Sequence, residues 1–210
     1  AFKAFNSDRA VVPFPVALNI PDGNGDIHIK PGYMKGSSTY TVKIASGFYD
    51  NPERGLPVSH GMLMLFDSRT GHPVCFEVDR CFLTDLRTAA AGAVAAKALA
   101  KKNVSRIAVI GTGTQARLQI MALSKVREFD ELRVWGRDSK KAEAYASEMS
   151  KVLGVKVVPA RTAEDAIRGS EIIVTATMST SPVVKAEWIS GGAHITAMGS
   201  DESGKQEIDT

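Results

Sequence analysis

The stretch Arg106–Ala116, which reads Arg-Ile-Ala-Val-Ile-Gly-Thr-Gly-Thr-Gln-Ala, decides the fold of this chain. A short apolar run stops at a glycine and is followed by a Gly-x-Gly-x-x-Ala spacing, which predicts a buried parallel strand, a phosphate-binding turn and a helix. Gly111 permits the sharp turn, Gly113 permits close approach of a pyrophosphate, and Ala116 is small enough for the helix to pack on the strand. The free N–H groups and the positive dipole end of that helix then face the phosphates. Glycines also follow strands in plain strand-to-helix turns, so the motif needs support from the rest of the chain.

The sequence on either side of the glycines continues as alternating strands and helices. The expected strands are Ile107–Ile110, Leu132–Trp135, Val155–Val158, Ile172–Ala176 and His194–Met198, and the expected helices are Thr114–Ser124, Ser139–Leu153 and Ala163–Arg168. This alternation predicts an α/β fold, a Rossmann doubly wound parallel sheet that binds NAD(P) over residues 104–210. Nothing remains for a sixth strand or for a cover over the last one. We therefore expect the C-terminal return of this domain to be missing from the chain.

The first part of the chain has a different period. Short alternating segments separated by turn residues predict an antiparallel, β-rich domain over residues 1–84. Its expected strands are Val11–Ile20, Asp26–Lys30, Tyr40–Ser46, Met62–Phe66 and Val74–Val78, with a hairpin turn at Asp67–Gly71. An alanine-rich helix capped by Thr84 is expected to connect the two domains over residues 85–103.

Composition excludes several classes of protein. The 210 residues are 44% hydrophobic and 23% charged, which is enough to bury a full core. The net charge of +3 is spread along the chain, so we expect no nucleic-acid partner and no membrane partner. Cys75 and Cys81 fit neither a disulfide framework nor a metal spacing, which indicates a cytoplasmic protein without a metal site. No apolar run reaches the roughly 18 residues of a membrane span, and we expect no targeting leader.

The end of the second Rossmann strand bears on the choice of cofactor. NAD enzymes place an Asp or Glu there to bind the ribose hydroxyls, whereas an Arg accommodates the 2′-phosphate of NADP. Gly136 occupies the position of the acid, and Arg137 follows it. We therefore expect NAD(P) with a lean towards NADP(H). Two alternatives stay open: Asp138 could turn inward, or Arg137 and Asp138 could only cap the helix that begins at Ser139.

Four separated motifs resemble the ornithine cyclodeaminase and µ-crystallin family. They are Tyr-Thr-Val-Lys-Ile around Lys43, Leu-Thr-Asp-Leu-Arg-Thr-Ala-Ala-Ala at Leu83–Ala91, the Gly111 turn, and Ala-Met-Gly-Ser-Asp-Glu-Ser-Gly-Lys-Gln-Glu at Ala197–Glu207. They follow the order and separations of the family over nearly the whole chain. The segment Phe48–Pro52, with Leu56 and Pro57 after it, is most similar to the ectoine-utilisation branch. The resemblance implies a Rossmann domain and a β-rich domain that binds substrate and forms a homodimer, with the first helical segment of that fold absent here.

The same resemblance implies roles for individual residues. Lys43 and Arg87 would hold the carboxylate of an amino acid or imine, and Asp201 would be the acid and base that moves a proton during hydride transfer. Lys30 stands where the family commonly has Met, and an arginine of several members is missing near Pro15–Ala17. Lys30 would therefore replace that cation or lie on the surface. The expected cofactor contacts are Thr88, Gly111, Thr112, Gly113, Thr114, Gln115, Ala116, Arg137, Thr175, Ala176, Thr177, Met198 and Gly199.

Each charged candidate also has an ordinary structural explanation. Lys43 could be a solvent-exposed charge on an edge strand. Arg87 could pair with Asp85 or Glu77, and Asp201 could cap a short helix in its own loop. The four histidines have neither the spacing of a metal site nor that of a catalytic triad.

These expectations lead to hydride transfer at the α-carbon of a small amino acid or its imine, with NAD(P) as cofactor. An amino acid could lose hydride and then ammonia, or an imine could receive hydride, because both reactions need the same groups. The nearest alternative is ornithine cyclodeaminase, which converts L-ornithine to L-proline and ammonia; the missing arginine and the added Lys30 weaken it. A protein of another class, which binds NADPH and a small ligand without turnover, also fits the fold.

Overall fold

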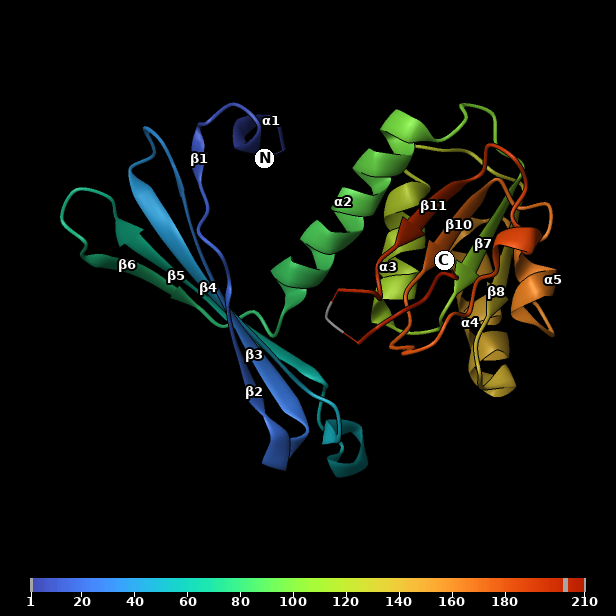
Figure 1. Ribbon diagram of the computed structural model, residues 1–210, viewed down its shortest axis with the longest axis horizontal. Coiled ribbons are helices and arrows are strands. Elements are labelled where there is room, and N and C mark those ends of the chain that lie inside the picture. Colours follow the sequence, from blue (N-terminus) through green and yellow to red (C-terminus); the bar gives the residue numbers. More distant parts are fainter. Residues whose placement is uncertain (1, 202–203, 210) are drawn as a thin grey trace. The chain divides into compact units, whose positions relative to one another are not determined.

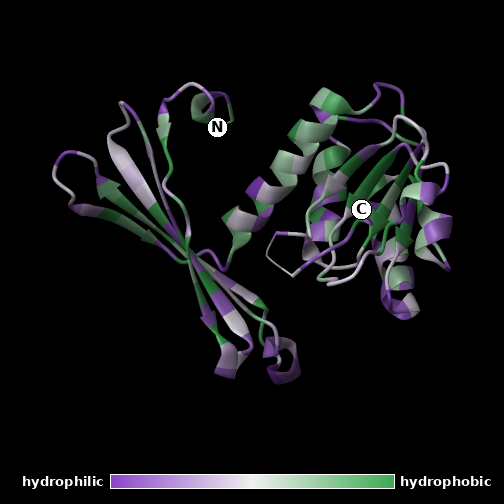
Figure 2. Cartoon of the chain, in the orientation of Figure 1, coloured by the Kyte–Doolittle hydropathy of each residue, from purple (hydrophilic) through white to green (hydrophobic). Residues whose placement is uncertain are grey.

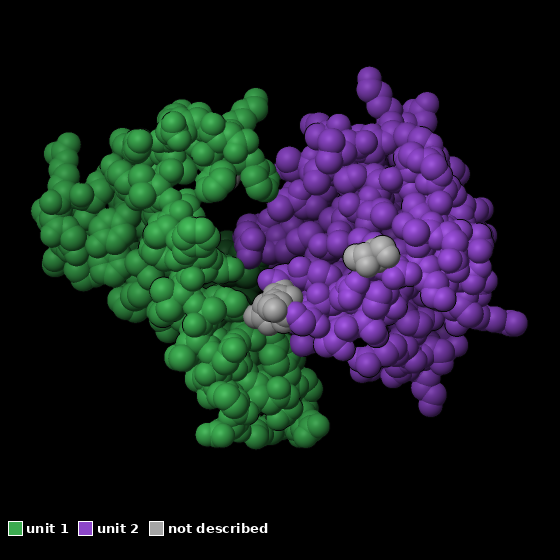
Figure 3. Space-filling view, viewed as in Figure 1, with its two compact units in different colours: residues 1–84 green, residues 85–210 purple. Residues whose placement is uncertain are grey.

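The chain forms two compact units in the computed structural model, which describes residues 2–201 and 204–209. Unit 1 comprises residues 1–84 and unit 2 residues 85–210 (Figures 1 and 3). The described part of each unit is built around its own sheet.

Unit 1 contains an antiparallel sheet in the strand order β1-β3-β4-β5-β6, with β2 also paired to β3. Its strands are β1 (Ala10–Val11), β2 (Val16–Ile20), β3 (Gly25–Met34), β4 (Thr39–Phe48), β5 (Ser59–Asp67) and β6 (Pro73–Glu77). The short helices of this unit are α1 (Phe2–Phe5), η1 (Pro21–Gly23) and η2 (Asn51–Arg54). The predicted antiparallel β architecture is confirmed, and β3 and β4 are longer than the alternation alone indicated.

One predicted strand of unit 1 was wrong. The segment Val11–Ile20 is split into β1 and β2, which pair with different parts of β3. Pro13 and Pro15 lie in the break, where each lacks the N–H that a ladder requires. The hairpin turn at Asp67–Gly71 is confirmed, because the Asp67 carboxylate accepts hydrogen bonds from the backbone N–H groups of Arg69 and Thr70 at 2.9 and 2.8 Å.

Helix α2 (Phe82–Leu99) begins earlier than the predicted connecting helix. The Asp79 carboxylate caps it by accepting from the N–H groups of Cys81 at 3.1 Å and Leu83 at 2.8 Å. The predicted Thr84 cap is therefore wrong, since Thr84 lies inside the first turn. Among the described residues, no helix, α2 included, is long and apolar enough to cross a membrane.

Unit 2 contains a five-stranded parallel sheet in the order β11-β10-β7-β8-β9. Its strands are β7 (Arg106–Ile110), β8 (Glu131–Trp135), β9 (Lys156–Pro159), β10 (Ile172–Thr175) and β11 (His194–Ala197), and its helices are α3 (Thr114–Leu123), α4 (Ser139–Leu153), α5 (Ala163–Ile167) and η3 (Ala186–Trp188). β8 and β9 follow β7 in chain order on one side of the sheet, and β11 follows β10 on the other. The predicted doubly wound Rossmann sheet is confirmed, and its switch point lies between β7 and β10.

The quoted apolar run forms the centre of unit 2. Ile107, Ala108, Val109 and Ile110 are each fully buried. Alternate residues enter different hydrophobic clusters, Ile107 and Val109 on one face of the sheet and Ala108 and Ile110 on the other. In Figure 2 the central strands of unit 2 are coloured as hydrophobic along most of their length. A strand buried on both faces needs apolar residues at successive positions, which explains why the run is continuous rather than alternating.

Candidate active site

The glycine turn lies at the switch point of the unit 2 sheet. Gly111 has a φ of +119°, and a Cβ there would overlap the carbonyl oxygen of Ala176, which follows β10. The N–H of Gly111 also donates to the Trp135 carbonyl at 2.8 Å. Only glycine fits this approach of the two strand ends. Gly113, in contrast, is exposed, and a Cβ there would meet nothing within 4 Å.

The first turn of α3 provides hydrogen-bond donors for an anion. No side chain caps the helix at Gly113, the residue in the N-cap position. The N–H groups of Thr114 and the following residues therefore remain without a side-chain acceptor, at the positive end of the helix dipole. Ala116 is fully buried beneath them, as the small-residue position of the motif predicts. The open Gly113 and the uncapped helix together fit the pyrophosphate of a dinucleotide.

Arg117 stabilises this turn through hydrogen bonds to its backbone. It was not among the residues predicted from the sequence. Its guanidinium donates to the carbonyl oxygens of Thr112 and Gly113 and to the Glu148 carboxylate of α4 at 2.9 Å. The hydrogen bond from Arg117 holds the pKa of Glu148 below its usual value. The guanidinium also lies 5.0 Å from the Tyr145 ring centroid. The sequence contains a signal for this contact, an arginine one turn after the glycines. Side chains of a helix point back towards its N-terminus, so an arginine at this position can reach the carbonyl groups of the turn.

Two predicted cofactor residues, Gln115 and Thr88, take part in hydrogen bonds between α3 and α2. The Gln115 amide donates to the Asp85 carboxylate at 2.8 Å, and the Thr88 carbonyl accepts from Gln119 at 3.1 Å. Any contribution of Gln115 to a phosphate site would therefore come from its backbone N–H. Asp85 is thus bonded within unit 2, while Arg87 is exposed and forms no ion pair with any residue that the structure describes.

The end of β8 contains no available acidic side chain. Gly136 lies against the turn, and a Cβ there would approach Thr112 Cγ2 to 2.8 Å. Asp138 caps α4 by accepting from the N–H groups of Lys140 at 3.0 Å and Lys141 at 3.2 Å, so the capping alternative is confirmed for this residue. The side chain of Arg137 is exposed and takes no part in that cap.

A buried carboxylate joins the ends of β10 and β11. Glu207 is fully buried and accepts four hydrogen bonds: from the Thr175 hydroxyl at 2.7 Å, the Thr177 N–H and hydroxyl at 2.6 and 2.7 Å, and the Gly199 N–H at 2.8 Å. The N–H of Met198 donates to the Thr175 carbonyl at 2.9 Å. Glu207 thereby joins the segment after β10, some 30 residues earlier, to the segment after β11 at the carboxyl edge of the sheet, where Gly111 also lies.

Asp201 follows β11 at this same edge. Its side chain is 67% exposed and accepts from Lys205 Nζ at 2.9 Å. The alternative of a helix cap in this loop involves Glu202 and Ser203, which lie outside the described residues. The Gly111 turn and Asp201 are therefore brought to one edge of unit 2, whereas Lys30 and Lys43 belong to unit 1.

The two lysines of unit 1 are neighbours across β3 and β4. Lys30 and Lys43 are directly opposite each other in the antiparallel register. β4 is paired on both sides, with β3 and with β5, so the edge-strand explanation for Lys43 was wrong. Lys43 Nζ donates to the Thr84 hydroxyl at 3.2 Å.

Known proteins resemble both the sequence and the structure. The model of the ornithine cyclodeaminase/mu-crystallin family matches residues 1–210. A Rhizobium meliloti protein, named provisionally as a dehydrogenase, is 46% identical over 209 residues, which are 100% of this chain and 64% of the relative. The alanine dehydrogenase of Archaeoglobus fulgidus is 37% identical over 210 residues, 100% of this chain and 62% of its own.

Two solved structures share the fold closely. Thermococcus litoralis Delta(1)-pyrroline-2-carboxylate reductase, in complex with NADH and L-proline, has a TM-score of 0.93 and 35% identity over 99% of this chain and 64% of its own. An archaeal alanine dehydrogenase dimer with bound NAD has a TM-score of 0.91 and 36% identity over 99% and 62%. The chain thus spans about 62–64% of the length of these relatives.

Proposed function

The chain belongs to the ornithine cyclodeaminase/mu-crystallin family, and we propose that it transfers hydride between a nicotinamide dinucleotide and the α-carbon of a small amino acid or its imine. The observation that carries this proposal is the edge of the unit 2 sheet. There, an open glycine turn and an uncapped helix N-terminus lie at the switch point, and the carboxylate of Asp201 follows the outer strand. Dinucleotides bind doubly wound sheets at this place.

Each residue has a defined task in the proposed reaction. When bound, the nicotinamide group accepts or supplies the hydride. Asp201 accepts a proton from the amine nitrogen in one direction and returns it to the imine nitrogen in the other. Lys205 donates to the Asp201 carboxylate at 2.9 Å and limits its rotation. Lys43 and Arg87 are proposed as ligands of the substrate carboxylate, since ammonium and guanidinium groups form charge-assisted hydrogen bonds with carboxylates.

A panel of substrates tests the reaction class. Full-length protein would be mixed with amino acids and oxidised cofactor, or with oxo acids, ammonia and reduced cofactor, and nicotinamide absorbance followed. Reduction of an oxo acid only when ammonia is present is the expected result. Proline formed from ornithine, with no net change in absorbance, would instead establish the cyclodeaminase. The absence of both an absorbance change and proline formation with every substrate would refute hydride transfer.

The strand end at Gly136 supports NADP(H) as the preferred form. Position 136 has no side chain, and a Cβ there would lie 2.8 Å from Thr112 Cγ2, while the neighbouring Asp138 carboxylate is used by the α4 cap. Without a carboxylate to bind the ribose hydroxyls, this position gives NAD(H) no binding advantage over NADP(H). The exposed guanidinium of Arg137 is a suitable partner for a 2′-phosphate.

Replacing Arg137 by Ala is expected to weaken NADPH binding by about 10- to 100-fold, the usual value of a hydrogen bond to a charged group, and NADH binding by less than about twofold. Binding would be measured through the fluorescence of the reduced nicotinamide. Lys125→Ala removes an exposed cation beyond the far end of α3 and serves as the matched control. Equal losses for both cofactors, or a wild-type preference for NADH, would contradict the assignment.

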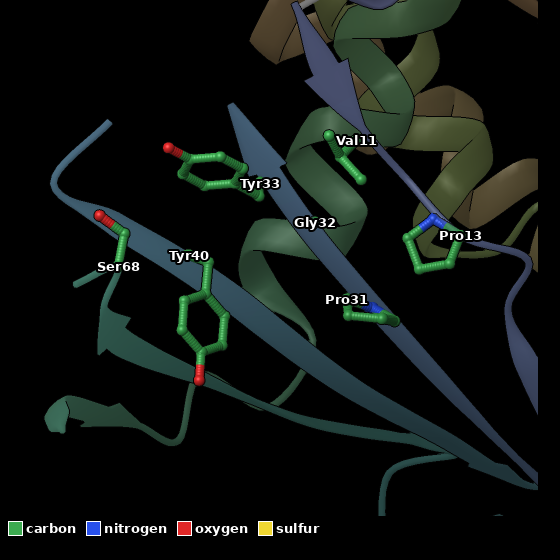
Figure 4. A pocket seen from close by; sticks show the side chains of 7 residues that line it. All are labelled: Val11, Pro13, Pro31, Gly32, Tyr33, Tyr40 and Ser68. Atoms are coloured by element: carbon green, nitrogen blue, oxygen red, sulfur yellow. The ribbon is translucent and has the colours of Figure 1, made fainter. Parts of the chain in front are cut away.

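An uncovered apolar face of unit 1 supports a homodimer. Alternate residues on this face are Val16, Leu18, Ile27, Ile29, Val42, Ile44, Met62, Met64 and Phe76. None of these side chains is buried, and Cys81 is the one buried hydrophobic residue among those described in unit 1. A pocket of about 300 Å³, lined by Pro31, Tyr33 and Tyr40 among others, continues the face (Figure 4). A face of this kind commonly marks a protein–protein interface.

We expect full-length protein to sediment as a dimer, and Ile44→Glu to shift it towards monomer. The reason is the cost of burying an unpaired carboxylate in the centre of the apolar face. Sedimentation velocity at micromolar concentration is the measurement, and Lys35→Glu, an exposed site in the turn after β3, is the control. A wild-type protein that remains monomeric would contradict the homodimer.

A further inference from the structure

The guanidinium of Arg117 binds the backbone of the glycine turn on one side. Its Nη1 donates to two successive carbonyl oxygens, that of Thr112 and that of Gly113, the second at 3.2 Å. The residues that the structure describes contain no cis peptide bond. In a planar trans peptide unit the C=O and the N–H point in opposite directions. The N–H groups of Gly113 and Thr114, which belong to these two peptide units, therefore point away from Arg117.

These two N–H groups are available to an anion. Gly113 and Thr114 are both exposed. Within residues 2–201 and 204–209, neither N–H donates to an acceptor of the protein. A Cβ at Gly113 would meet nothing within 4 Å, so the backbone of the turn is accessible from outside. Adjacent backbone donors with a common orientation suit the oxygens of a pyrophosphate.

Glu148 of α4 determines the orientation of the guanidinium. Arg117 Nε donates to the two carboxylate oxygens of Glu148 at 3.1 and 2.9 Å, and Nη2 lies 2.8 Å from Oε2. This ion pair uses the side of the guanidinium formed by Nε and Nη2, which leaves Nη1 directed at the turn. The Tyr145 ring, with its centroid 5.0 Å from the guanidinium, supports the same position. A carboxylate 31 residues after Arg117 thus helps to fix the peptide units of the turn.

The pair acts through the backbone rather than through its charge. All three nitrogens of the guanidinium are engaged by Glu148 or by the turn. Arg117 also lies on the opposite side of the two peptide units from a phosphate bound to their N–H groups. Because the two charges of the pair are in contact, they largely cancel at a distance. A guanidinium that donates to a carbonyl oxygen does, however, polarise that peptide unit and make its N–H a stronger donor.

We infer that Arg117 and Glu148 are positioning residues for the pyrophosphate of the dinucleotide, and that the phosphate affinity of the glycine turn depends on both. This inference rests on the proposed function for the binding of a dinucleotide at this edge of the sheet. Glu148 orients Arg117, Arg117 orients the peptide units, and their N–H groups bind the phosphate. A carboxylate near a phosphate site ordinarily weakens binding by repulsion. Here, its removal is expected to weaken binding further.

ADP-ribose and adenosine test this inference, because only ADP-ribose carries the pyrophosphate. In isothermal titration calorimetry on full-length protein, Arg117→Met is expected to bind ADP-ribose about 10- to 100-fold more weakly than the wild type, the usual value of a hydrogen bond to a charged group. Its adenosine affinity should be that of the wild type. Glu148→Ala should weaken ADP-ribose binding by about 3- to 10-fold, since the guanidinium stays but is no longer held.

Arg133→Met is the matched control. The side chain of Arg133 is 28% exposed, as is that of Arg117, and it pairs with the Glu131 carboxylate at 2.8 Å. It also donates to a backbone carbonyl, that of Asp165 in α5, at 2.8 Å. The variant therefore loses a comparable set of contacts away from the glycine turn, and it should bind both ligands with wild-type affinity.

Stronger binding of ADP-ribose by Glu148→Ala would show that Arg117 acts through its charge, and would overturn the inference. Unchanged ADP-ribose affinity in Arg117→Met, an equal loss for adenosine, or a wild-type protein that binds neither ligand would overturn it as well. Glu148 is exposed, so Glu148→Ala decides the matter even if thermal unfolding shows that Arg117→Met does not fold. Wild-type ADP-ribose affinity in Arg117→Met would leave the proposed hydride transfer intact. The expected binding pattern without turnover of any substrate would refute hydride transfer alone.

Discussion

Replacing Asp201 by Asn is expected to lower kcat by about 100- to 10,000-fold, the range in which a positioned acid and base contributes to proton transfer. The amide can still accept a hydrogen bond from Lys205 but cannot take up the proton of an amine. Because the Asp201 side chain is 67% exposed, the free energy of unfolding should change by no more than about 0.5 kcal/mol. Cofactor affinity, measured by fluorescence, should remain that of the wild type.

Glu143→Gln is the matched control for this experiment, because it removes one exposed carboxylate from α4 in the same unit. Its kcat should equal that of the wild type. A kcat of Asp201→Asn within about threefold of the wild-type value would place the acid and base elsewhere, and a wild-type protein without turnover would belong to the non-catalytic binders.

Replacing Glu207 by Gln is expected to lower the free energy of unfolding by about 2–4 kcal/mol, although the side chain keeps its shape. One carboxylate oxygen accepts from the Thr177 N–H and the other from the Gly199 N–H. Whichever oxygen becomes the amide NH₂ then faces a backbone donor that it cannot accept from. The full burial of Glu207 excludes bulk water from this position.

Urea denaturation measures this loss, with Glu143→Gln as the control for a carboxylate-to-amide change at an exposed site. A midpoint equal to that of the wild type would contradict the role of Glu207. The same variant should also bind cofactor more weakly, because Glu207 holds Thr177 in the segment after β10, which borders the Gly111 turn. Glu207→Asp, which keeps the charge, is expected to have a free energy of unfolding between those of the wild type and Glu207→Gln.

The fold of unit 2 could be predicted from the sequence because the signals for its strands and helices are local. A buried apolar run, a glycine turn and a helical period occupy consecutive residues, and the observed bounds of β7, α3 and α4 differ from the expected ones by one residue at most. The small residue at Ala116 and the capping Asp138 follow from the same local rules.

The strand bounds of unit 1 and the hydrogen bonds that stabilise the site were harder to predict from the sequence. Two prolines hidden within an apolar segment divided one expected strand, and an Asp five residues ahead of Thr84 supplied the helix cap. The hydrogen bonds of Glu207 join residues that are 30 and 32 positions apart. No local period encodes such contacts, and the opposition of Lys30 and Lys43 depends on a register that becomes visible only once the sheet is formed.

The contact between Gly136 and Thr112 also couples these two positions in evolution. The Cβ of an acidic residue gained at position 136 would lie 2.8 Å from the Thr112 methyl group, so the Thr112 side chain would have to shift. A smaller residue at position 112 removes that contact. We therefore expect the two sites to be epistatic, with an acidic residue at position 136 tolerated better after the change at position 112.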